Sequence, residues 1–186
     1  MAVESRDPYT AGHQKRVSAL AGAISREMGF TPEDCEAIRM AGAIHDLGKI
    51  SIPAEILSMP RRLMELEYEL IKTHAEKGYQ ILKDIEFGRP IAEIVHQHHE
   101  RLDGSGYPRG LKGEEILMEA RIMAVADTVE AMGTHRPYRA SLGIEAALAT
   151  IAAGRGSLYD RQVVDVCLRL FREQNYSLLD EGNSLS

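Results

Sequence analysis

The chain has 186 residues, 44% hydrophobic and 27% charged, which is typical of a globular protein and excludes a fibre or a disordered tail. Its net charge of −6 argues against non-specific binding to duplex nucleic acid but leaves room for a small phosphorylated substrate held by metal ions. It has no membrane-spanning apolar run, no secretory signal and no CxxC motif, so we expect a cytoplasmic protein without a membrane association.

Helical periodicity runs through the chain from its first segment. Apolar residues recur at intervals of three and four over residues 13–30, which predicts a helix that stops at Gly29. Thr31 is expected to cap the next helix, with Pro32 in its first turn and Asp34 in the capping-box position. These signals predict two consecutive helices joined by a tight turn.

The second helix is expected to end near HDLGKI at residues 45–50, where Gly48 can stop it. Strand patterns are absent beyond very short runs, so the fold class is all-α. Further helices are predicted at residues 63–85 with a break around 73–78, and at 90–100, 118–132, 144–154 and 160–174.

One long loop interrupts this helical pattern. The stretch RLDGSGYPRGLKGEEI, at residues 101–116, holds four glycines and a proline, and loops of this length in compact domains are often functional. One domain is expected over residues 1–176, with 177–186 as a frayed tail. Because the chain opens directly on a motif-like stretch, we also expect it to belong to a longer protein with an upstream sensor or receiver domain.

Histidines concentrate in the first half of the chain, several of them at predicted helix ends. Taken singly, each is an ordinary packed or exposed side chain. Together with two aspartates, five of them form a set that is large enough to bind more than one metal ion. This set is His13, His45, Asp46, His74, His98, His99 and Asp127. Mixed nitrogen and oxygen donors suit Fe, Mn, Co, Ni or Zn, and the lack of a cysteine cluster argues against a closed structural zinc site. Asp46 is the candidate carboxylate shared between two metals.

Five segments follow one another in a characteristic order. They read ESRDPYTAGHQKRV at 4–17, HDLGKI at 45–50, HAEKG at 74–78, HHERLDGSGYPRG at 98–110 and ADTVEAMGTHRPYR at 126–139. In order and spacing, over about residues 4–172, they resemble the HD-GYP family of the HD phosphohydrolase superfamily. The resemblance implies a compact, all-helical HD-type domain over residues 1–176, with the long glycine-rich stretch as its GYP loop.

The resemblance also implies a metal-dependent phosphodiesterase that hydrolyses cyclic di-GMP to linear pGpG and onward to GMP. The first metal is implied to bind His13, His45, Asp46 and Asp127. The second metal is implied to bind Asp46, His74, His98 and His99. Two divalent transition-metal ions, Fe or Mn, are expected, since members with a third metal carry a Glu where this chain has Tyr9.

Other roles follow from the same resemblance. Asp46 and Lys49 are the implied catalytic residues, with Lys49 on the scissile phosphate, where a fixed cation stabilises developing charge. The implied substrate-binding residues are Asp7, Gly106, Tyr107, Pro108, Arg136 and Arg139. The roles of three polar residues are not assigned. Glu100 either orients His98 or His99 or is solvated, Glu130 stands where the family often has Asp, and His135 has no matched role.

Alternative functions remain at this point. The chain is either the enzyme described above or a non-catalytic receptor for cyclic di-GMP, although every implied metal ligand is present. A related cyclic dinucleotide such as 3′,3′ cyclic GMP-AMP is the main rival substrate. A dNTP triphosphohydrolase is disfavoured because the GYP and RPYR motifs lie outside the basic HD pattern. A protein-binding role of the GYP loop is compatible with catalysis. Metal identity, end product and oligomeric state are open.

Overall fold

The computed structural model describes residues 10–58, 61, 63–134 and 142–178. Its helices are α1 (Thr10–Glu27), α2 (Pro32–Ile44), α3 (Ala54–Leu57), α4 (Glu65–Lys72), α5 (His74–Leu82), α6 (Ile91–Gln97), α7 (Met118–Gly133), α8 (Ile144–Ala153) and α9 (Arg161–Glu173). Two short 3-10 helices, η1 (Leu47–Ser51) and η2 (Gly113–Glu115), lie between them. No β-strand occurs in these ranges, which confirms the all-α class.

The turn between α1 and α2 follows the sequence signals. Gly29 adopts a φ of +82°, a conformation that glycine takes without a steric penalty, and so ends the first helix. The Thr31 hydroxyl accepts a hydrogen bond from the backbone N–H of Asp34 at 3.2 Å and donates one to the Asp34 carboxylate at 2.7 Å. Pro32 opens α2. The predicted cap is therefore confirmed.

Gly48 does not have the predicted role. The second helix already ends at Ile44, and Gly48 lies inside η1. A Cβ atom at Gly48 would overlap the carbonyl oxygen of His74 and the backbone nitrogen of Gly78. The glycine is needed because η1 packs backbone to backbone against α5. This contact brings the HD dipeptide against the start of α5.

The break predicted around residues 73–78 is much narrower in the structure. It falls at Thr73, between α4 and α5, and His74 already begins the next helix. Gly78 lies inside α5, where an added Cβ atom would crowd the Val95 side chain of α6. The sequence pattern was ambiguous here because a glycine that permits close packing looks the same as a glycine that ends a helix.

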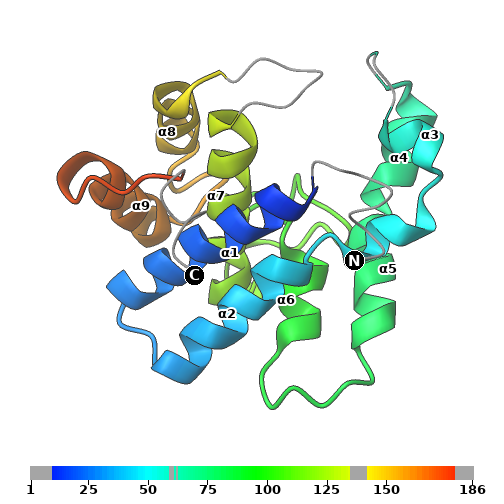
Figure 1. Ribbon diagram of the computed structural model, residues 1–186, viewed down its shortest axis with the longest axis horizontal. Coiled ribbons are helices and arrows are strands. Elements are labelled where there is room, and N and C mark those ends of the chain that lie inside the picture. The colour runs from blue at the N-terminus through cyan, green and yellow to red at the C-terminus, as the bar shows by residue number, and fades with distance from the viewer. Residues whose placement is uncertain (1–9, 59–60, 62, 135–141, 179–186) are drawn as a thin grey trace.

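The hydrophobic core lies where α1, α2, α6, α7, α8 and α9 meet. Figure 1 shows α7 near the centre, with α1 across it, α2 alongside α1, α8 and α9 on one side and α5 and α6 on the other. Fully buried core side chains include Leu20, Ile24, Ile38, Ile94, Ile122, Met123, Leu148 and Ile151. None of the helices described is long and apolar enough to cross a lipid bilayer.

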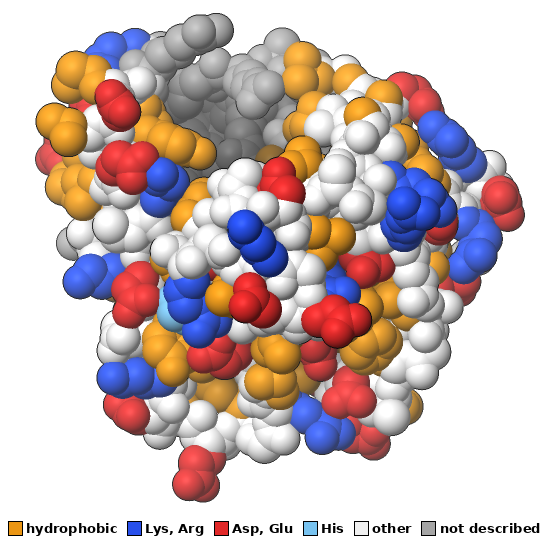
Figure 2. All heavy atoms as spheres, turned by 180° about the vertical axis from the view of Figure 1, so that it is seen from behind, with side chains coloured by type: hydrophobic (Ala, Val, Ile, Leu, Met, Phe, Trp, Pro, Cys, Tyr) orange, Lys and Arg blue, Asp and Glu red, His pale blue; other side chains and the backbone are white. Residues whose placement is uncertain are grey.

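Helices α3 and α4 form an arm that extends from this body beside the start of α5 (Figure 1). The sequence did not predict the short α3. Figure 2 shows hydrophobic side chains over the arm. Leu66 of α4 is 82% exposed, and Met64, which directly precedes α4, is 59% exposed. Residues 98–117, between α6 and α7, contain no helix except η2, as expected for the glycine-rich loop.

Candidate metal centre and substrate loop

Helix ends and the middle of α7 bring the predicted metal ligands together. His45 and His98 are the residues that directly follow α2 and α6, and His74 is the first residue of α5. Asp46 directly precedes η1, and Asp127 lies within α7. The buried members of the set are His13, His45, Asp46, His74 and His98, whereas His99 and Asp127 are partly buried. All seven lie close to one another.

The first donor group joins α1, α2 and α7. The Nε2 atom of His13 lies 3.4 Å from Asp127 Oδ1, and the Nε2 atom of His45 lies 3.9 Å from the same oxygen. One donor atom from each of these three residues falls within 4.8 Å of the others. These are three of the four residues implied as ligands of the first metal.

The second donor group joins α5 with the end of α6. The Nε2 atoms of His74 and His98 lie 3.3 Å apart. The His99 ring lies 4.0 Å from the His98 ring and 5.0 Å from the His74 ring, measured between centroids. Donor atoms of the three histidines again lie within 4.8 Å of one another.

Asp46 lies between the two groups. Its Oδ2 atom is 3.6 Å from Nε2 of His45 and 3.9 Å from Nε2 of His13. Its Oδ1 atom is 3.6 Å from Nε2 of His74. One carboxylate therefore offers one oxygen to each group, which is the geometry expected of a bridging ligand.

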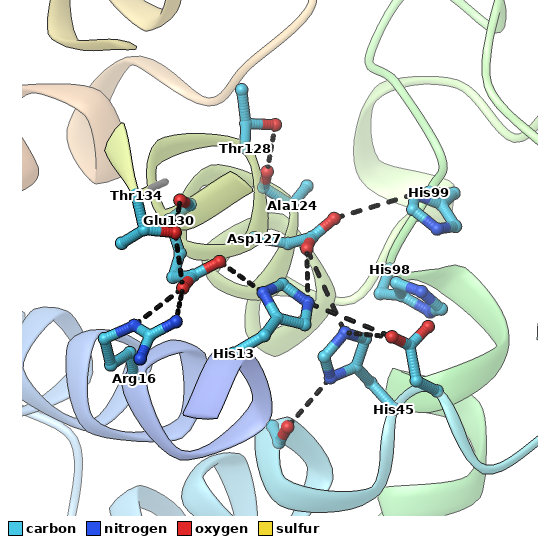
Figure 3. Close-up of polar contacts among 12 residues, drawn as sticks. His13, Arg16, His45, His98, His99, Ala124, Asp127, Thr128, Glu130 and Thr134 are labelled. Carbon is cyan, nitrogen blue, oxygen red and sulfur yellow. Dashed lines mark hydrogen bonds and ion pairs between the residues drawn. The ribbon is translucent and has the colours of Figure 1, made fainter. Parts of the chain in front are cut away.

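Asp127 also reaches both groups, which the sequence did not indicate. Its Oδ1 atom faces the first group, whereas its Oδ2 atom lies 3.9 Å from Nδ1 of His99. Figure 3 shows the Asp127 carboxylate between His13 and His99. The second oxygen of Asp127 is thus directed at a residue of the second group.

The tautomers of three histidines are fixed by the backbone. Nδ1 of His45, His74 and His98 lies 2.8, 2.7 and 2.6 Å from the carbonyl oxygen three residues earlier. Because a carbonyl oxygen only accepts, each Nδ1 carries the hydrogen and each Nε2 directs a lone pair into the site. Burial, together with the His45 and His74 rings, lowers the pKa of His98 to about 3, which favours its neutral form.

This donor set fits divalent metal ions. The two Nε2 lone pairs 3.3 Å apart repel each other, and a cation between them converts that repulsion into two bonds. Burial alone would raise the pKa of Asp46, but the Lys49 ammonium and the imidazoles hold it well below its usual value. The centre thus combines a neutral His98 with an ionised Asp46, the protonation states that metal binding requires of these two groups.

Glu130 of α7 orients His13, a role that the sequence left open. The Nδ1 atom of His13 contacts Glu130 Oε2, and Arg16 donates from Nε to Glu130 Oε1 at 2.7 Å. Figure 3 shows His13 and Arg16 of α1 converging on this carboxylate. Burial alone would lower the pKa of His13, but the Asp127 and Glu130 carboxylates raise it to about 9. The glutamate that this chain has in place of the aspartate common in the family therefore fits between His13 and Arg16.

The GYP loop lies directly on the segment that carries His99. A Cβ atom at Gly106 would overlap the backbone of Glu100 and the carbonyl oxygen of His99, so only glycine allows this close approach. The Tyr107 N–H donates to the His99 carbonyl at 3.3 Å. The Tyr107 ring is 4.6 Å from the His99 ring, and burial raises the pKa of the Tyr107 hydroxyl. Pro108 follows it in the loop.

Both roles considered for Glu100 are wrong. Its side chain is 2% exposed, so it is not solvated. Oε1 accepts a hydrogen bond from the Arg109 N–H at 2.7 Å, and Oε2 accepts one from the Leu111 N–H at 3.0 Å. The carboxylate closes the GYP loop and touches neither His98 nor His99 through these bonds. The sequence signal that was available is an acidic residue directly before a long loop, whose backbone N–H groups need acceptors.

Some residues of the matched motifs have no described position. Asp7, Tyr9, His135, Arg136 and Arg139 fall outside the described ranges. His96 is buried on α6 but lies apart from the donor groups, where its Nε2 atom is 2.7 Å from the Glu76 carboxylate.

Comparison with known families decides the classification. The HD domain family matches residues 1–163. The chain belongs to the HD domain family. Together with the relatives described next, this match confirms the predicted membership of the HD-GYP family. HD domain phosphohydrolases are metal-dependent, in agreement with the His and Asp donor groups described above.

Three curated relatives of this HD domain are named phosphodiesterases. It is 44% identical over 170 residues to the cyclic di-GMP phosphodiesterase response regulator RpfG of Xanthomonas campestris, covering 90% of the chain and 45% of that relative. It is 43% identical over 177 residues to a cyclic di-GMP phosphodiesterase of Thermotoga maritima, covering 93% and 48%. It is 40% identical over 147 residues to the 3′3′-cGAMP-specific phosphodiesterase 3 of Vibrio cholerae, covering 79% and 32%. The chain thus spans half or less of the length of these relatives.

Solved structures share the fold of this HD domain. Bd1817, an HDG"Y"P protein from Bdellovibrio bacteriovorus, aligns with a TM-score of 0.71 and 20% identity, over 86% of this chain and 51% of that one. The PgpH HD domain of L. monocytogenes, solved with cyclic-di-AMP, aligns with a TM-score of 0.66 and 19% identity, over 94% of each chain. At these identities the likeness establishes the fold alone.

Proposed function

We propose that this HD domain is a metal-dependent phosphodiesterase that hydrolyses cyclic di-GMP to linear pGpG and onward to GMP. The observation that carries the proposal is the position of Asp46, which offers one carboxylate oxygen to each of two histidine groups. Two relatives at 44% and 43% identity that are named cyclic di-GMP phosphodiesterases support the choice of substrate.

The proposed cofactors are two divalent transition-metal ions, Fe or Mn. The first would be held by His13, His45, Asp46 and Asp127. The second would be held by Asp46, His74, His98 and His99. When bound, such a pair lowers the pKa of water and stabilises the oxygen that leaves phosphorus. Tyr9, in the place of a glutamate, favours two ions over three.

The chain's own groups would position the phosphodiester. The Lys49 ammonium lies 2.7 Å from Asp46 Oδ2, so it is already at the centre and can donate to a non-bridging phosphate oxygen. Gly106, Tyr107 and Pro108 would bring the loop to the substrate. Further contacts to guanine or phosphate are proposed for Asp7, Arg136 and Arg139, since arginine donates in a bidentate fork to either group.

A related cyclic dinucleotide is the second candidate substrate. The observation that favours it is the 40% identity to a Vibrio cholerae phosphodiesterase named as specific for 3′3′-cGAMP. The cytoplasmic location and the upstream sensor or receiver domain stay predictions of the sequence.

The direct test is turnover by protein purified without oxygen and loaded with Fe or Mn. Two metal ions per chain and conversion of cyclic di-GMP to pGpG, followed by GMP, are expected. Absence of product from the loaded protein would overturn the enzymatic function, and tight binding without turnover would identify a receptor. Faster turnover of 3′,3′ cyclic GMP-AMP would select the second substrate.

Replacing Lys49 by alanine tests the phosphate contact. The expected result is a fall in kcat of about 10²–10³-fold, as for removal of one fixed transition-state donor, with the metal content unchanged. The control is Lys83→Ala, because Lys83 is exposed at the end of α5. An unchanged kcat in a correctly metallated Lys49→Ala protein contradicts the assignment.

Replacing Glu100 by glutamine tests the closure of the GYP loop. An amide accepts at one oxygen only, so one of the two loop N–H groups faces an NH₂ group. Since an unsatisfied buried group costs about 1–3 kcal/mol, KM should rise about 5–150-fold with the metal content retained. Glu114→Gln, at an exposed loop position, is the matched control. Equal KM values for the two variants would rule out this role.

A further inference from the structure

A cavity of about 420 Å³ lies beside the GYP loop, outside the two donor groups. The end of α4, the first turns of α5 and the loop line it, and it is open to solvent. Glu69, Lys72, Glu76, Lys77 and Tyr107 are the lining residues with charged or aromatic groups. Its volume falls within the range of about 300–1,000 Å³ that is common for small-molecule sites.

Tyr107 connects this cavity with the metal centre. Its ring packs against the His99 ring at 4.6 Å between centroids and also lines the cavity. The Lys72 ammonium lies 5.7 Å from the centroid of Tyr107 and 5.4 Å from that of Tyr68. A planar base in the cavity would therefore meet an aromatic side chain and an ammonium group next to the proposed catalytic centre.

The polar lining carries both signs of charge within reach of each other. The Glu69 carboxylate lies 2.5 Å from the Lys72 ammonium, and these side chains are 56% and 26% exposed. Glu76 is already engaged, with the His96 ring at 2.7 Å and the Gln80 amide at 2.7 Å. Lys77 also lines the cavity and is exposed, so Glu69 is the carboxylate, and Lys72 the ammonium beside Tyr107, that a ligand can address together.

This pair has the complementarity that guanine requires. Guanine presents N1–H and N2–H donors on one edge, which a single carboxylate can accept together, and O6 and N7 acceptors, to which an ammonium can donate. Adenine lacks the N1–H donor and places an NH₂ group where guanine has O6. A site that combines Glu69 with Lys72 thus favours guanine and disfavours adenine.

We propose that this cavity is a guanine-binding subsite, in which Glu69 and Lys72 read the base beside the ring of Tyr107. The inference rests on the proposed function and deepens it, because the bound guanine belongs to the half of the cyclic dinucleotide remote from the phosphodiester being cut. Cyclic di-GMP offers a guanine in either orientation, 3′,3′ cyclic GMP-AMP in one of two, and cyclic di-AMP in none. The subsite therefore ranks these substrates in that order.

The test compares the binding of 5′-GMP and 5′-AMP to the full chain. The two nucleotides share the same phosphate, so a difference in affinity reports on the base alone. By calorimetry, the native chain should bind GMP about tenfold more tightly than AMP, the size expected for loss of one good hydrogen-bonded pair. Glu69→Gln should remove that preference, since an amide cannot accept from both N1–H and N2–H. Lys72→Met should weaken GMP binding and leave AMP binding unchanged.

Glu65→Gln is the control, because Glu65 is an exposed acid in the first turn of the same helix and does not line the cavity. A GMP-to-AMP ratio that is the same in the native chain, Glu69→Gln and Glu65→Gln overturns the subsite. The outcomes also separate the two proposals. Turnover of cyclic di-GMP with an unchanged ratio in Glu69→Gln retains the enzyme and rejects the subsite. If the GMP-to-AMP ratio changes in Glu69→Gln but the native chain does not turn over cyclic di-GMP, the subsite is retained and the enzymatic function is rejected.

Discussion

Replacement of Asp46 by asparagine is expected to abolish hydrolysis of cyclic di-GMP, with kcat reduced by at least about 10³-fold, equivalent to about 4 kcal/mol of transition-state stabilisation. Each of its oxygens faces a different histidine group, at 3.6 Å from His45 and 3.6 Å from His74. Asparagine is nearly the same size but is neutral, and it offers an oxygen to only one group. No other described carboxylate has equally close contacts with Nε2 atoms of both groups.

The measurement pairs single-turnover kinetics with a metal count and a thermal unfolding curve. The metal count should fall below two per chain in Asp46→Asn. Because Asp46 is 2% exposed and pairs with Lys49, the unfolding curve shows whether any loss of activity reflects loss of the fold. Asp103→Asn is the control, since the Asp103 carboxylate accepts local bonds from the N–H and the hydroxyl of Ser105 in the exposed loop. A fully metallated Asp46→Asn protein with kcat within tenfold of the native value would refute the bridge.

The helices and the donor set were predictable because their signals are local. Apolar spacing identified the faces that pack in the core, and Thr31 with Pro32 marked the start of α2. The histidines and aspartates of the centre stand in short motifs at helix ends, so their residue types and order were sufficient to group them. The structure then brings the predicted donors together, and their role as metal ligands stays a proposal.

The missed features all depend on contacts between distant segments. Gly48 looks like a helix stop until α5 is seen against its backbone. Glu100 looks like a partner for a neighbouring histidine, but its acceptor atoms turn toward N–H groups nine and eleven residues ahead. Glu130 and His13 are separated by 117 positions, so their contact exists only after α1 has packed on α7. Such partners are fixed by tertiary packing, which residue type alone does not encode.

The contact between Glu130 and His13 leads to the second large expected effect. Glu130 is fully buried and also accepts a hydrogen bond from the Thr134 hydroxyl at 2.9 Å. Glu130→Ala would remove the carboxylate that contacts Nδ1 of the buried His13 ring and pairs with the partly buried Arg16 guanidinium. Removing one member of a buried charged pair costs about 3–5 kcal/mol, so a clear fall in the unfolding temperature is expected. Urea unfolding should show the same loss without a change in m value.

Loss of Glu130 is also expected to lower the affinity for metal ions, which a purely structural role would not explain. By fixing Nδ1 of His13, Glu130 directs Nε2 toward Asp127 at 3.4 Å, and loss of such a support lowers metal affinity by about 10–100-fold. Glu130→Gln retains an oxygen that can accept from His13 but loses the charge that pairs with Arg16. Metal affinity in this variant should therefore fall less than in Glu130→Ala, although both are destabilised. Glu119→Ala, at the start of α7, is the control. If titration with Mn²⁺ gave equal affinities for the native, glutamine and alanine proteins, Glu130 would have no part in positioning His13.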